Sequence, residues 1–391
     1  MHPSRRSAVP AFEVMTLLDR VAQLRAEGRE VWSLCAGEPS QGAPRPVREA
    51  ATRALNSGQA MGYSASFGLL ELRAELAAHY RRWYDIDVDP AQIAVTTGAS
   101  GAFLAIFLAA FDAGERVAVV RPGYPAYRNI LGSLGCEVVE LDCGPDQRYQ
   151  PTVAQLAAVH AEQPLSGLVL ASPANPTGTM IDAESLELLA AWCRDNKVRL
   201  ISDEIYHGIT FTGSVGECAW TYDRGSAVIS SFSKYWGMTG WRLGWTLVPE
   251  DLVNNVDAVL GNYALCAPVL AQHAALAAFT DQSYDECEDA VREFARARDT
   301  ALGLIDELGW QDVAPADGAF YLYASIKPVL GRFADSREWC FALLEDTGVA
   351  ITPGLDFDAV EGGHTVRVSL AAGAATVEQA LRRVIAWQQA A

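Results

Sequence analysis

The sequence is short of positive charge, and this shortage limits the kinds of partner that the protein can have. Thirty Lys and Arg residues stand against 48 Asp and Glu residues, so the formal net charge is −18. Binding to nucleic acid needs clustered Lys and Arg opposite the phosphates, so we expect no nucleic-acid partner. A small anionic ligand is still compatible with this charge, because a local basic pocket can form in an acidic protein.

Long apolar runs and paired metal-ligand motifs are also lacking. The longest apolar stretch, Gly101 to Phe111, is too short to cross a bilayer and stops at Asp112, so we expect no membrane partner. No apolar segment typical of a secretion signal follows Arg5 and Arg6. The eight cysteines contain no CxxC pair and the six histidines no HExxH motif. We therefore expect reduced thiols, a cytoplasmic location and no metal site.

Two other motif classes can be set aside. The chain contains neither a Walker A sequence nor GxGxxG, the phosphate-binding signatures of many nucleotide-binding proteins. Residues 231–234 match the SxxK motif of serine β-lactamases, but the SDN and KTG motifs that accompany it there are lacking. We interpret the SxxK match as accidental.

From residue 93 onward, short β-branched runs alternate with helical patterns. This alternation predicts an α/β fold with a largely parallel sheet covered by helices on both faces. The sequence after residue 275 is rich in helical patterns followed by strand-like segments, and it predicts a second, smaller α+β domain. We expect strands at Ile93–Thr97, Val117–Val120, Val138–Leu141, Leu168–Ala171, Val198–Ser202, Val228–Ser231, Ala319–Ala324, Val349–Thr352 and Thr365–Ser369. We expect helices at Phe12–Glu27, Leu69–Tyr84, Ala102–Phe111, Ala126–Leu134 and Ala183–Asp195, and a loop at Ala36–Pro46.

Polar residues follow the predicted strands of the larger domain. In open α/β sheets, ligands bind just beyond the carboxyl ends of the strands, so residues that follow different strands are expected to meet at one sheet edge. An anion cradle, an aromatic ring, an amide, a carboxylate and a lysine therefore converge on one site. The segments are Gly98-Ala99-Ser100, Pro122-Gly123-Tyr124-Pro125, Ser172 to Gly178, Asp203-Glu204-Ile205-Tyr206 and Ser231-Phe232-Ser233-Lys234.

The anion cradle suits the phosphate of pyridoxal 5′-phosphate (PLP). The turn Gly98-Ala99-Ser100 offers backbone N–H groups and a hydroxyl at the N-terminus of a helix, where a phosphate is favoured. Ser231, Ser233 and Arg242 can add bonds to the same phosphate.

The remaining groups suit the ring and the reactive carbon of PLP. Asp203 can pair with the pyridine nitrogen and keep it protonated, which makes the ring an electron sink. Asn175 and Tyr206 can hydrogen-bond the phenolic oxygen, and Tyr124 can stack on the ring face. Lys234 can form the Schiff base, which needs a neutral amine and therefore a pKa lowered by burial or by nearby cations.

The segment Ser231–Trp245, SFSKYWGMTGWRLGW, closely resembles the SxSKxxxMxGWRxG signature of the class I/II aminotransferases of PLP fold type I. Further family motifs follow in the same order over residues 12–385. The resemblance implies a large PLP-binding domain, residues 41–275, with a mostly parallel seven-stranded sheet between helices. It also implies a smaller α+β domain made of residues 1–40 and 276–391. The other matching motifs are Gly37-Glu38-Pro39, Gly62-Tyr63, Thr97 to Ser100, Pro122 to Pro125, Asn175 to Gly178, Asp203 to Tyr206 and Val366 to Ser369.

The resemblance also assigns residues to the substrate and to a second subunit. Arg367 would clamp the substrate α-carboxylate through a bidentate fork, Asn175 would help to hold it, and the backbone of Gly37 would lie beside it. Tyr63 would reach the phosphate of the neighbouring subunit, which implies a homodimer with shared active sites.

The implied reaction is ping-pong transfer of an amino group from an α-amino acid to a 2-oxo acid. Lys234 would act as Schiff-base lysine and proton-transfer base, with Asp203 and Tyr206 as the other catalytic residues. PLP-dependent lyases, cyclising synthases and oxidases share this scaffold and remain the alternatives. A PLP-sensing regulator is not favoured, since no DNA-binding domain is appended and the charge is negative.

Three positions depart from the family pattern or invite a second interpretation. A lysine that reaches the distal carboxylate of the substrate in one aspartate-specific branch is replaced by Ser100, which favours a donor with a neutral or apolar side chain. Gln41 stands where the family often has an aromatic residue, and it either changes the polarity of the pocket or lies in a surface loop. His207 is expected to be structural, because Lys234 already supplies the proton transfer.

Overall fold

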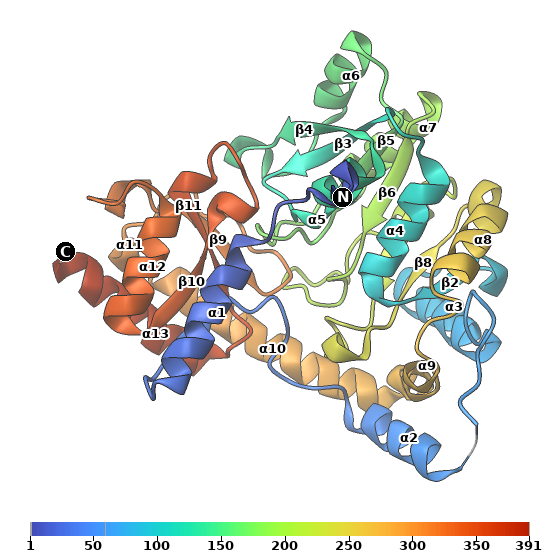
Figure 1. Ribbon diagram of the computed structural model, residues 1–391, viewed down its shortest axis with the longest axis horizontal. Helices are drawn as coiled ribbons and strands as arrows, with labels where there is room; N and C mark the ends of the chain where they lie inside the picture. Colours follow the sequence, from blue (N-terminus) through green and yellow to red (C-terminus); the bar gives the residue numbers. More distant parts are fainter. Residues whose placement is uncertain (1, 59, 391) are drawn as a thin grey trace.

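The computed structural model describes residues 2–58 and 60–390. The predicted domain limits at residues 1 and 391 lie outside this range. Two sheets organise the chain, and Figure 1 shows them side by side with the long helix α10 (Asp281–Gly303) running beneath both. Within the described residues, no helix is both long and apolar enough to cross a membrane.

The larger sheet has seven strands in the order β2-β8-β7-β6-β5-β3-β4. Only β8 runs antiparallel to its neighbours, so the prediction of a mostly parallel seven-stranded sheet is confirmed. The strands are β2 (Ile93–Thr96), β3 (Arg116–Arg121), β4 (Glu137–Asp142), β5 (Gly167–Ala171), β6 (Arg199–Asp203), β7 (Ala227–Ser231) and β8 (Gly244–Leu247).

Helices cover both faces of this sheet, and the strand sequences reflect this double burial. Leu168 and Leu170 of β5 belong to one apolar cluster, whereas Val169 between them belongs to the cluster on the other face. A strand that is buried on both faces is apolar throughout, so it lacks the alternation of a half-exposed strand. The covering helices are α3 (Leu70–Tyr84), α4 (Gly98–Ala110), α5 (Ala126–Leu134), α6 (Val153–Glu162), α7 (Ala183–Asp195) and α8 (Val253–Tyr263).

The smaller sheet joins the two ends of the chain. Its order is β1-β10-β11-β9, and β1 pairs in parallel with β10, so an N-terminal strand completes a C-terminal sheet. In Figure 1 the blue helix α1 lies beside the orange and red helices of this unit. The elements are β1 (Trp32–Leu34), β9 (Tyr321–Ser325), β10 (Val349–Pro353), β11 (Thr365–Ser369), α1 (Glu13–Ala26), α11 (Ile305–Leu308), α12 (Ser336–Thr347) and α13 (Ala374–Ala390).

Several elements differ from the sequence prediction. Helix α4 begins at Gly98 and not at Ala102, because packing against β7 and β8 overrides the weak helix propensity of its glycines. Helix α2 (Arg45–Asn56) begins inside the predicted loop, with Pro44 at its N-cap, and packs against α9 (Val269–Ala275). Strands β1 and β8, like α2 and α6, were not predicted. β8 is short and wholly buried, so it has no periodic pattern.

The loop after β5 is bound to the segment before β9, and Gly178 lies at their contact. Its carbonyl accepts a bond of 2.9 Å from Gly318 N, its φ is +68°, and a Cβ there would lie 2.7 Å from Gly318 O. We expect Gly178→Ala to lower the free energy of unfolding by about 1–3 kcal/mol.

Gly132→Ala is the matched control, since Gly132 lies within α5 and a Cβ there would meet nothing within 4 Å. We expect this variant to be stabilised by up to about 1 kcal/mol. Denaturant unfolding followed by circular dichroism measures both. A Gly178→Ala protein as stable as the wild type would contradict the close contact.

Candidate active site

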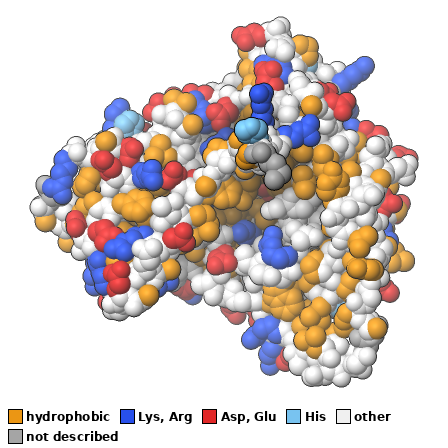
Figure 2. Space-filling view, viewed as in Figure 1, with side chains coloured by type: hydrophobic (Ala, Val, Ile, Leu, Met, Phe, Trp, Pro, Cys, Tyr) orange, Lys and Arg blue, Asp and Glu red, His pale blue; other side chains and the backbone are white. Residues whose placement is uncertain are grey.

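A cavity of about 440 Å³ lies where the carboxyl ends of the large-sheet strands face the small-sheet unit. Its lining comes from α1, from the loops after β1, β3, β5, β6 and β7, and from β9 and β11. In Figure 2 the surface is hollowed near the middle of the molecule, and hydrophobic side chains gather around the hollow. Most of the predicted site residues line this cavity: Gly37, Ala99, Ser100, Tyr124, Asn175, Asp203, Tyr206, Ser233, Lys234, Arg242 and Arg367.

Asp203 carries a buried carboxylate at the end of β6. Its side chain accepts hydrogen bonds from the hydroxyl of Tyr127 and from the backbone N–H of Ile205. Burial raises its pKa to about 6, against the opposing effects of these two bonds and of Lys234. At neutral pH the group is therefore mostly ionised. A buried carboxylate that faces a cavity is suited to a cationic N–H group of a ligand.

Lys234 follows β7, and its Nζ lies 2.5 Å from the carbonyl oxygen of Gly37. Burial, together with the nearby charge of Arg367, lowers the pKa of this amine to about 8, whereas Glu38 and Asp203 act in the opposite direction. A substantial share of the amine is thus neutral near physiological pH, which is the form that attacks a carbonyl carbon.

An anion cradle lies at the N-terminus of α4. Gly98 has φ +70°, and a Cβ on it would lie 2.5 Å from Nη2 of Arg242, so the guanidinium rests directly against the Gly98 backbone. Ser233 lines the cavity, whereas Ser231 does not. The Oγ of Ser231 lies 2.8 Å from both Ser233 Oγ and the carbonyl of Leu243, so this hydroxyl orients Ser233.

Arg367 lies on β11 with only 4% of its surface exposed. Its Nη1 donates to Oδ1 of Asn175 at 3.0 Å, and its Nη2 donates to the carbonyl of Cys35 at 2.9 Å. The guanidinium carbon lies 4.4 Å from the centre of the Tyr321 ring and 4.8 Å from that of Phe357. Its Nε has no partner among the described residues. Arg367 lines the cavity, so a guanidinium held in place by these contacts is suited to a carboxylate that enters it.

Sequence reasoning missed two tyrosines that fix predicted residues. The hydroxyl of Tyr127 on α5 donates a hydrogen bond to Asp203. Tyr127 follows the predicted site residue Tyr124 by three positions, which could have marked it as a neighbour of the site. Tyr321 shares a hydrogen bond of 2.8 Å with the hydroxyl of Tyr206. Nothing in the sequence around Tyr321 distinguishes it from the other buried residues of β9.

Two further positions lie away from the cavity. His207 is buried, its Nδ1 lies 2.6 Å from the hydroxyl of Tyr84, and burial lowers its pKa to about 3. It therefore stays neutral and lines no part of the cavity, as expected for a structural histidine. Tyr63 is 83% exposed and does not line the cavity of its own chain.

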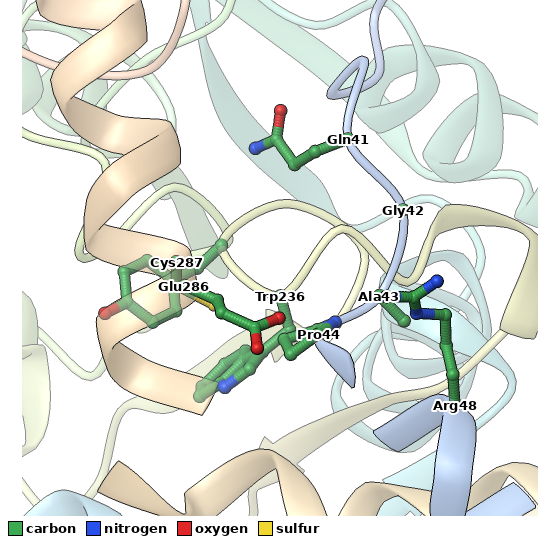
Figure 3. A pocket seen from close by; sticks show the side chains of 9 residues that line it. Gln41, Gly42, Ala43, Pro44, Arg48, Trp236, Glu286 and Cys287 are labelled. Carbon is green, nitrogen blue, oxygen red and sulfur yellow. The ribbon is translucent and has the colours of Figure 1, made fainter. Parts of the chain in front are cut away.

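Gln41 belongs to a second, smaller cavity of about 240 Å³. Figure 3 shows this cavity between the segment that precedes α2 and the residues Glu286 and Cys287 of α10. Glu286 accepts a hydrogen bond from the backbone N–H of Arg45 at 2.8 Å. Gln41 does not line the larger cavity, so within this chain it does not change the polarity of the candidate active site.

The groups around the larger cavity fit PLP. The Gly98 backbone leaves room for the Arg242 guanidinium beside a helix N-terminus, which suits the phosphate. The buried carboxylate of Asp203 suits the protonated ring nitrogen, and the amine of Lys234 suits the aldehyde. These complementary groups come from three different strand ends of one sheet, as the sequence predicted.

Comparison with known proteins gives a consistent result. The model of the family "Aminotransferase class I and II" matches residues 29–384. A valine–pyruvate aminotransferase of Mycobacterium tuberculosis is 49% identical over 98% of this chain and 97% of its own length. A crystal structure of an aminotransferase from the same organism has a TM-score of 0.96 at 48% identity, covering 100% of both chains. An aspartate aminotransferase from Thermus thermophilus with maleate has a TM-score of 0.91 at 31% identity, covering 99% of both chains.

The lowered pKa of Lys234 predicts how covalent attachment of PLP to the apoprotein depends on pH. The neutral amine increases as the pH rises through the pKa, so the rate should rise about tenfold per pH unit well below pH 8 and level off above it. The measurement is stopped-flow absorbance after PLP is mixed with apoprotein.

Arg367→Gln should move the midpoint of this profile to higher pH, because it removes a positive charge that lowers the pKa of Lys234. Lys327→Ala, which removes an exposed lysine, should leave the midpoint unchanged. A wild-type midpoint near the ordinary lysine value of 10.5 would show that Lys234 is not perturbed.

Proposed function

Because this chain belongs to the class I and II aminotransferases and uses pyridoxal 5′-phosphate, we propose that it transfers the amino group of a branched apolar amino acid, with valine as the leading candidate, to a 2-oxo acid such as pyruvate. The transfer of an amino group between amino and oxo acids follows from the family, and the identity of the two substrates is the proposal. The relative that is 49% identical is a valine–pyruvate aminotransferase, which supports the proposed substrates.

The observation that carries the proposal is the single buried guanidinium of Arg367 in a cavity that also has an apolar wall. One buried guanidinium suits one carboxylate, the α-carboxylate of an amino acid. The only other cationic side chains among the described lining residues are Lys234 and Arg242, and both are assigned to PLP. Val14, Met15 and Leu18 of α1 also line the cavity, and these apolar side chains favour an apolar substrate side chain.

The proposed mechanism assigns a task to each residue. Lys234 would hold PLP through its side-chain amine and would give up that place to the amine of the substrate. When PLP is bound, it supplies the electron sink that disperses the negative charge left on the substrate α-carbon. The freed Nζ of Lys234 accepts the α-proton and later releases it, which its pKa of about 8 permits in both directions near neutral pH.

The other residues hold the reacting groups in place. Asp203 would hold the protonated ring nitrogen through its carboxylate. Arg367 and Asn175, already joined by a bond of 3.0 Å, fix the substrate carboxylate beside Lys234. Tyr206, whose hydroxyl is held by that of Tyr321, would donate to the phenolic oxygen.

We also propose a homodimer in which Tyr63 completes the phosphate site of the partner. Several large apolar side chains on or next to α2, α3 and α8 are exposed, as expected for a subunit interface. They are Leu55, Met61, Tyr63, Leu70, Tyr263 and Leu265.

The remaining proposals concern domains and location. We propose a large domain of residues 41–275 and a small domain of residues 1–40 and 276–391, and the separate sheets support this division. The eight cysteines are unpaired, which supports a reducing, cytoplasmic location.

Removing the carboxylate clamp should weaken reaction with amino acids selectively. Arg367→Ala should lower kcat/KM for valine by about 100-fold or more, because charge-assisted bonds to the α-carboxylate are lost. Isobutylamine, which is valine without its carboxylate, provides the control, and its slow reaction should be unaffected. Stopped-flow absorbance of the bound PLP measures both, and mass analysis identifies the oxo-acid product. An equal loss for valine and isobutylamine would remove the assigned role of Arg367.

A mixed dimer tests the shared site. Lys234→Ala and Tyr63→Ala homodimers should each be impaired, the first in turnover and the second in PLP affinity. Co-expression should produce heterodimers with one intact site, because the intact Lys234 and the intact Tyr63 meet in the same site. Purified heterodimers should therefore regain about half of the wild-type activity at limiting PLP. Heterodimers without any recovery, or a fully active monomer, would refute the shared site.

A further inference from the structure

Helix α1 forms one wall of the cavity, yet its own sequence does not cap it. Phe12 occupies the N-cap position and makes no side-chain hydrogen bond to the helix. The carboxylate of Asp356, 343 residues from Glu13, takes this role: Oδ1 accepts the N–H of Glu13 at 2.6 Å, and Oδ2 accepts the N–H of Val14 at 2.9 Å. The N–H groups of a helix's first turn have no partner within the helix, and here one buried carboxylate accepts hydrogen bonds from two of them.

Asp356 is itself fixed to the large-sheet unit. Its carbonyl oxygen accepts a bond of 2.7 Å from Nη2 of Arg128 on α5. The carbonyl of the next residue, Phe357, accepts a bond of 3.0 Å from the N–H of Gly123. Asp358 forms an ion pair of 2.8 Å with Arg121 at the end of β3. The cap is therefore anchored to the same strand end and helix that present Tyr124 to the cavity.

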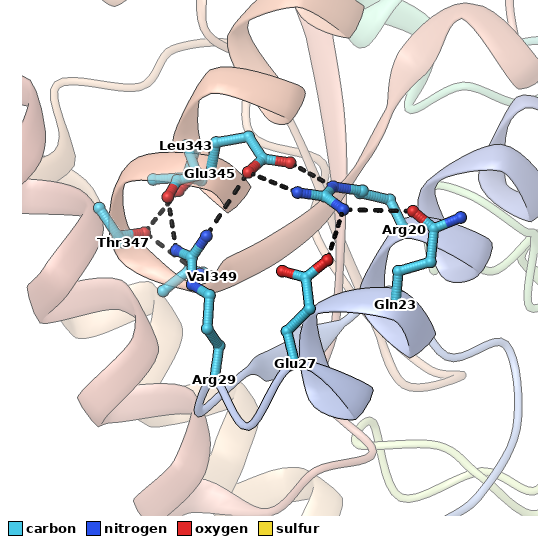
Figure 4. Close-up of polar contacts among 8 residues, drawn as sticks. All are labelled: Arg20, Gln23, Glu27, Arg29, Leu343, Glu345, Thr347 and Val349. Carbon is cyan, nitrogen blue, oxygen red and sulfur yellow. Dashed lines mark hydrogen bonds and ion pairs between the residues drawn. The ribbon is translucent and has the colours of Figure 1, made fainter.

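The other end of α1 has separate anchors. Arg20 forms two bonds to Glu345 of α12, at 2.5 Å and 3.0 Å, and Arg29 bonds to the same residue (Figure 4). The buried face of the helix, with Leu17 and Val21, packs against the small-sheet unit. Loss of the Asp356 carboxylate would therefore loosen the first turn and leave the rest of the helix in place.

Resting on the proposed function, we propose that Asp356 is a positioning residue that determines substrate specificity. By capping α1 it holds Val14, Met15 and Leu18 as the apolar wall against which a branched substrate side chain packs. Asp356 itself lines the cavity, but its carboxylate is bound to the first turn of α1 and forms no hydrogen bond with Lys234, Asn175 or Arg367 among the described residues. Its removal should weaken binding of substrates that need the wall and spare those that do not.

The experiment compares valine with alanine, which has a single methyl side chain. Asp356→Ala holoenzyme should lose about fivefold in kcat/KM for valine, the effect of one lost helix cap, and less than about twofold for alanine. The loss should lie in KM, with the rate at saturating valine unchanged. Asp356→Asn keeps one acceptor oxygen and should give an intermediate value.

Asp182→Ala is the matched control. Asp182 caps α7 through a bond of 2.8 Å from Ser185 N and lies outside the cavity, so the valine-to-alanine ratio should not change. A double variant of Asp356→Ala with Leu18→Ala should lose less than the product of the two single losses, because both changes act on the same wall.

Amide hydrogen exchange gives a readout that does not depend on activity. Exchange in the peptide of residues 12–20 should accelerate in Asp356→Ala and not in Asp182→Ala. Unchanged exchange, or equal losses for valine and alanine, would overturn the role of Asp356. A third outcome separates the two proposals. If exchange accelerates in Asp356→Ala but the wild type reacts with aspartate and not with valine, both the proposed substrate and the specificity role are wrong. In that case Asp356 caps α1 without determining specificity.

Discussion

The burial of three charged groups around one cavity is the constraint on which the rest of the structure depends. Asp203 and Arg367 are buried and Lys234 is half-buried, and each charge would be costly there without compensation. The compensation is specific to each group. Hydrogen bonds help to keep Asp203 ionised, burial and the charge of Arg367 lower the pKa of Lys234 to about 8, and Arg367 donates hydrogen bonds to Asn175 and to the carbonyl of Cys35. These buried charges favour two kinds of ligand. A cofactor with a cationic ring nitrogen and an aldehyde suits Asp203 and Lys234, and a substrate carboxylate suits Arg367.

The two sheets make this arrangement rigid. The seven-stranded sheet is apolar on both faces, so the strand ends that carry Asp203 and Lys234 cannot shift without disturbing two packed layers. The smaller sheet brings Arg367 opposite them, and its link to Asn175 of the large-sheet unit crosses the cavity. Helix α1 closes one side although it comes from the other end of the chain. The cavity is thus assembled from segments that are distant in sequence and bound together by a few polar contacts.

These facts explain which features the sequence could predict. Asp203, Lys234 and the Gly98 turn each follow a strand, so the rule that ligands bind at strand ends was enough to bring them together. The family signature added Arg367, which no local pattern marks. Strand β8 could not be predicted, because its four residues are all buried and therefore show no alternation of apolar and polar side chains. The cap of α1 by Asp356 escaped because a contact between residues 343 positions apart leaves no local signal.

The central claim is that Lys234 is the residue that holds PLP, and the chain is well suited to a direct test because it has only three lysines, Lys197, Lys234 and Lys327. Lys197 and Lys327 are exposed, whereas Lys234 lines the cavity. Holoenzyme reduced with borohydride, digested and examined by mass spectrometry should carry the pyridoxyl phosphate mass on the peptide that contains Lys234, at one group per chain. The same mass on the peptide of Lys197 or Lys327, or its absence from all three, would contradict the account.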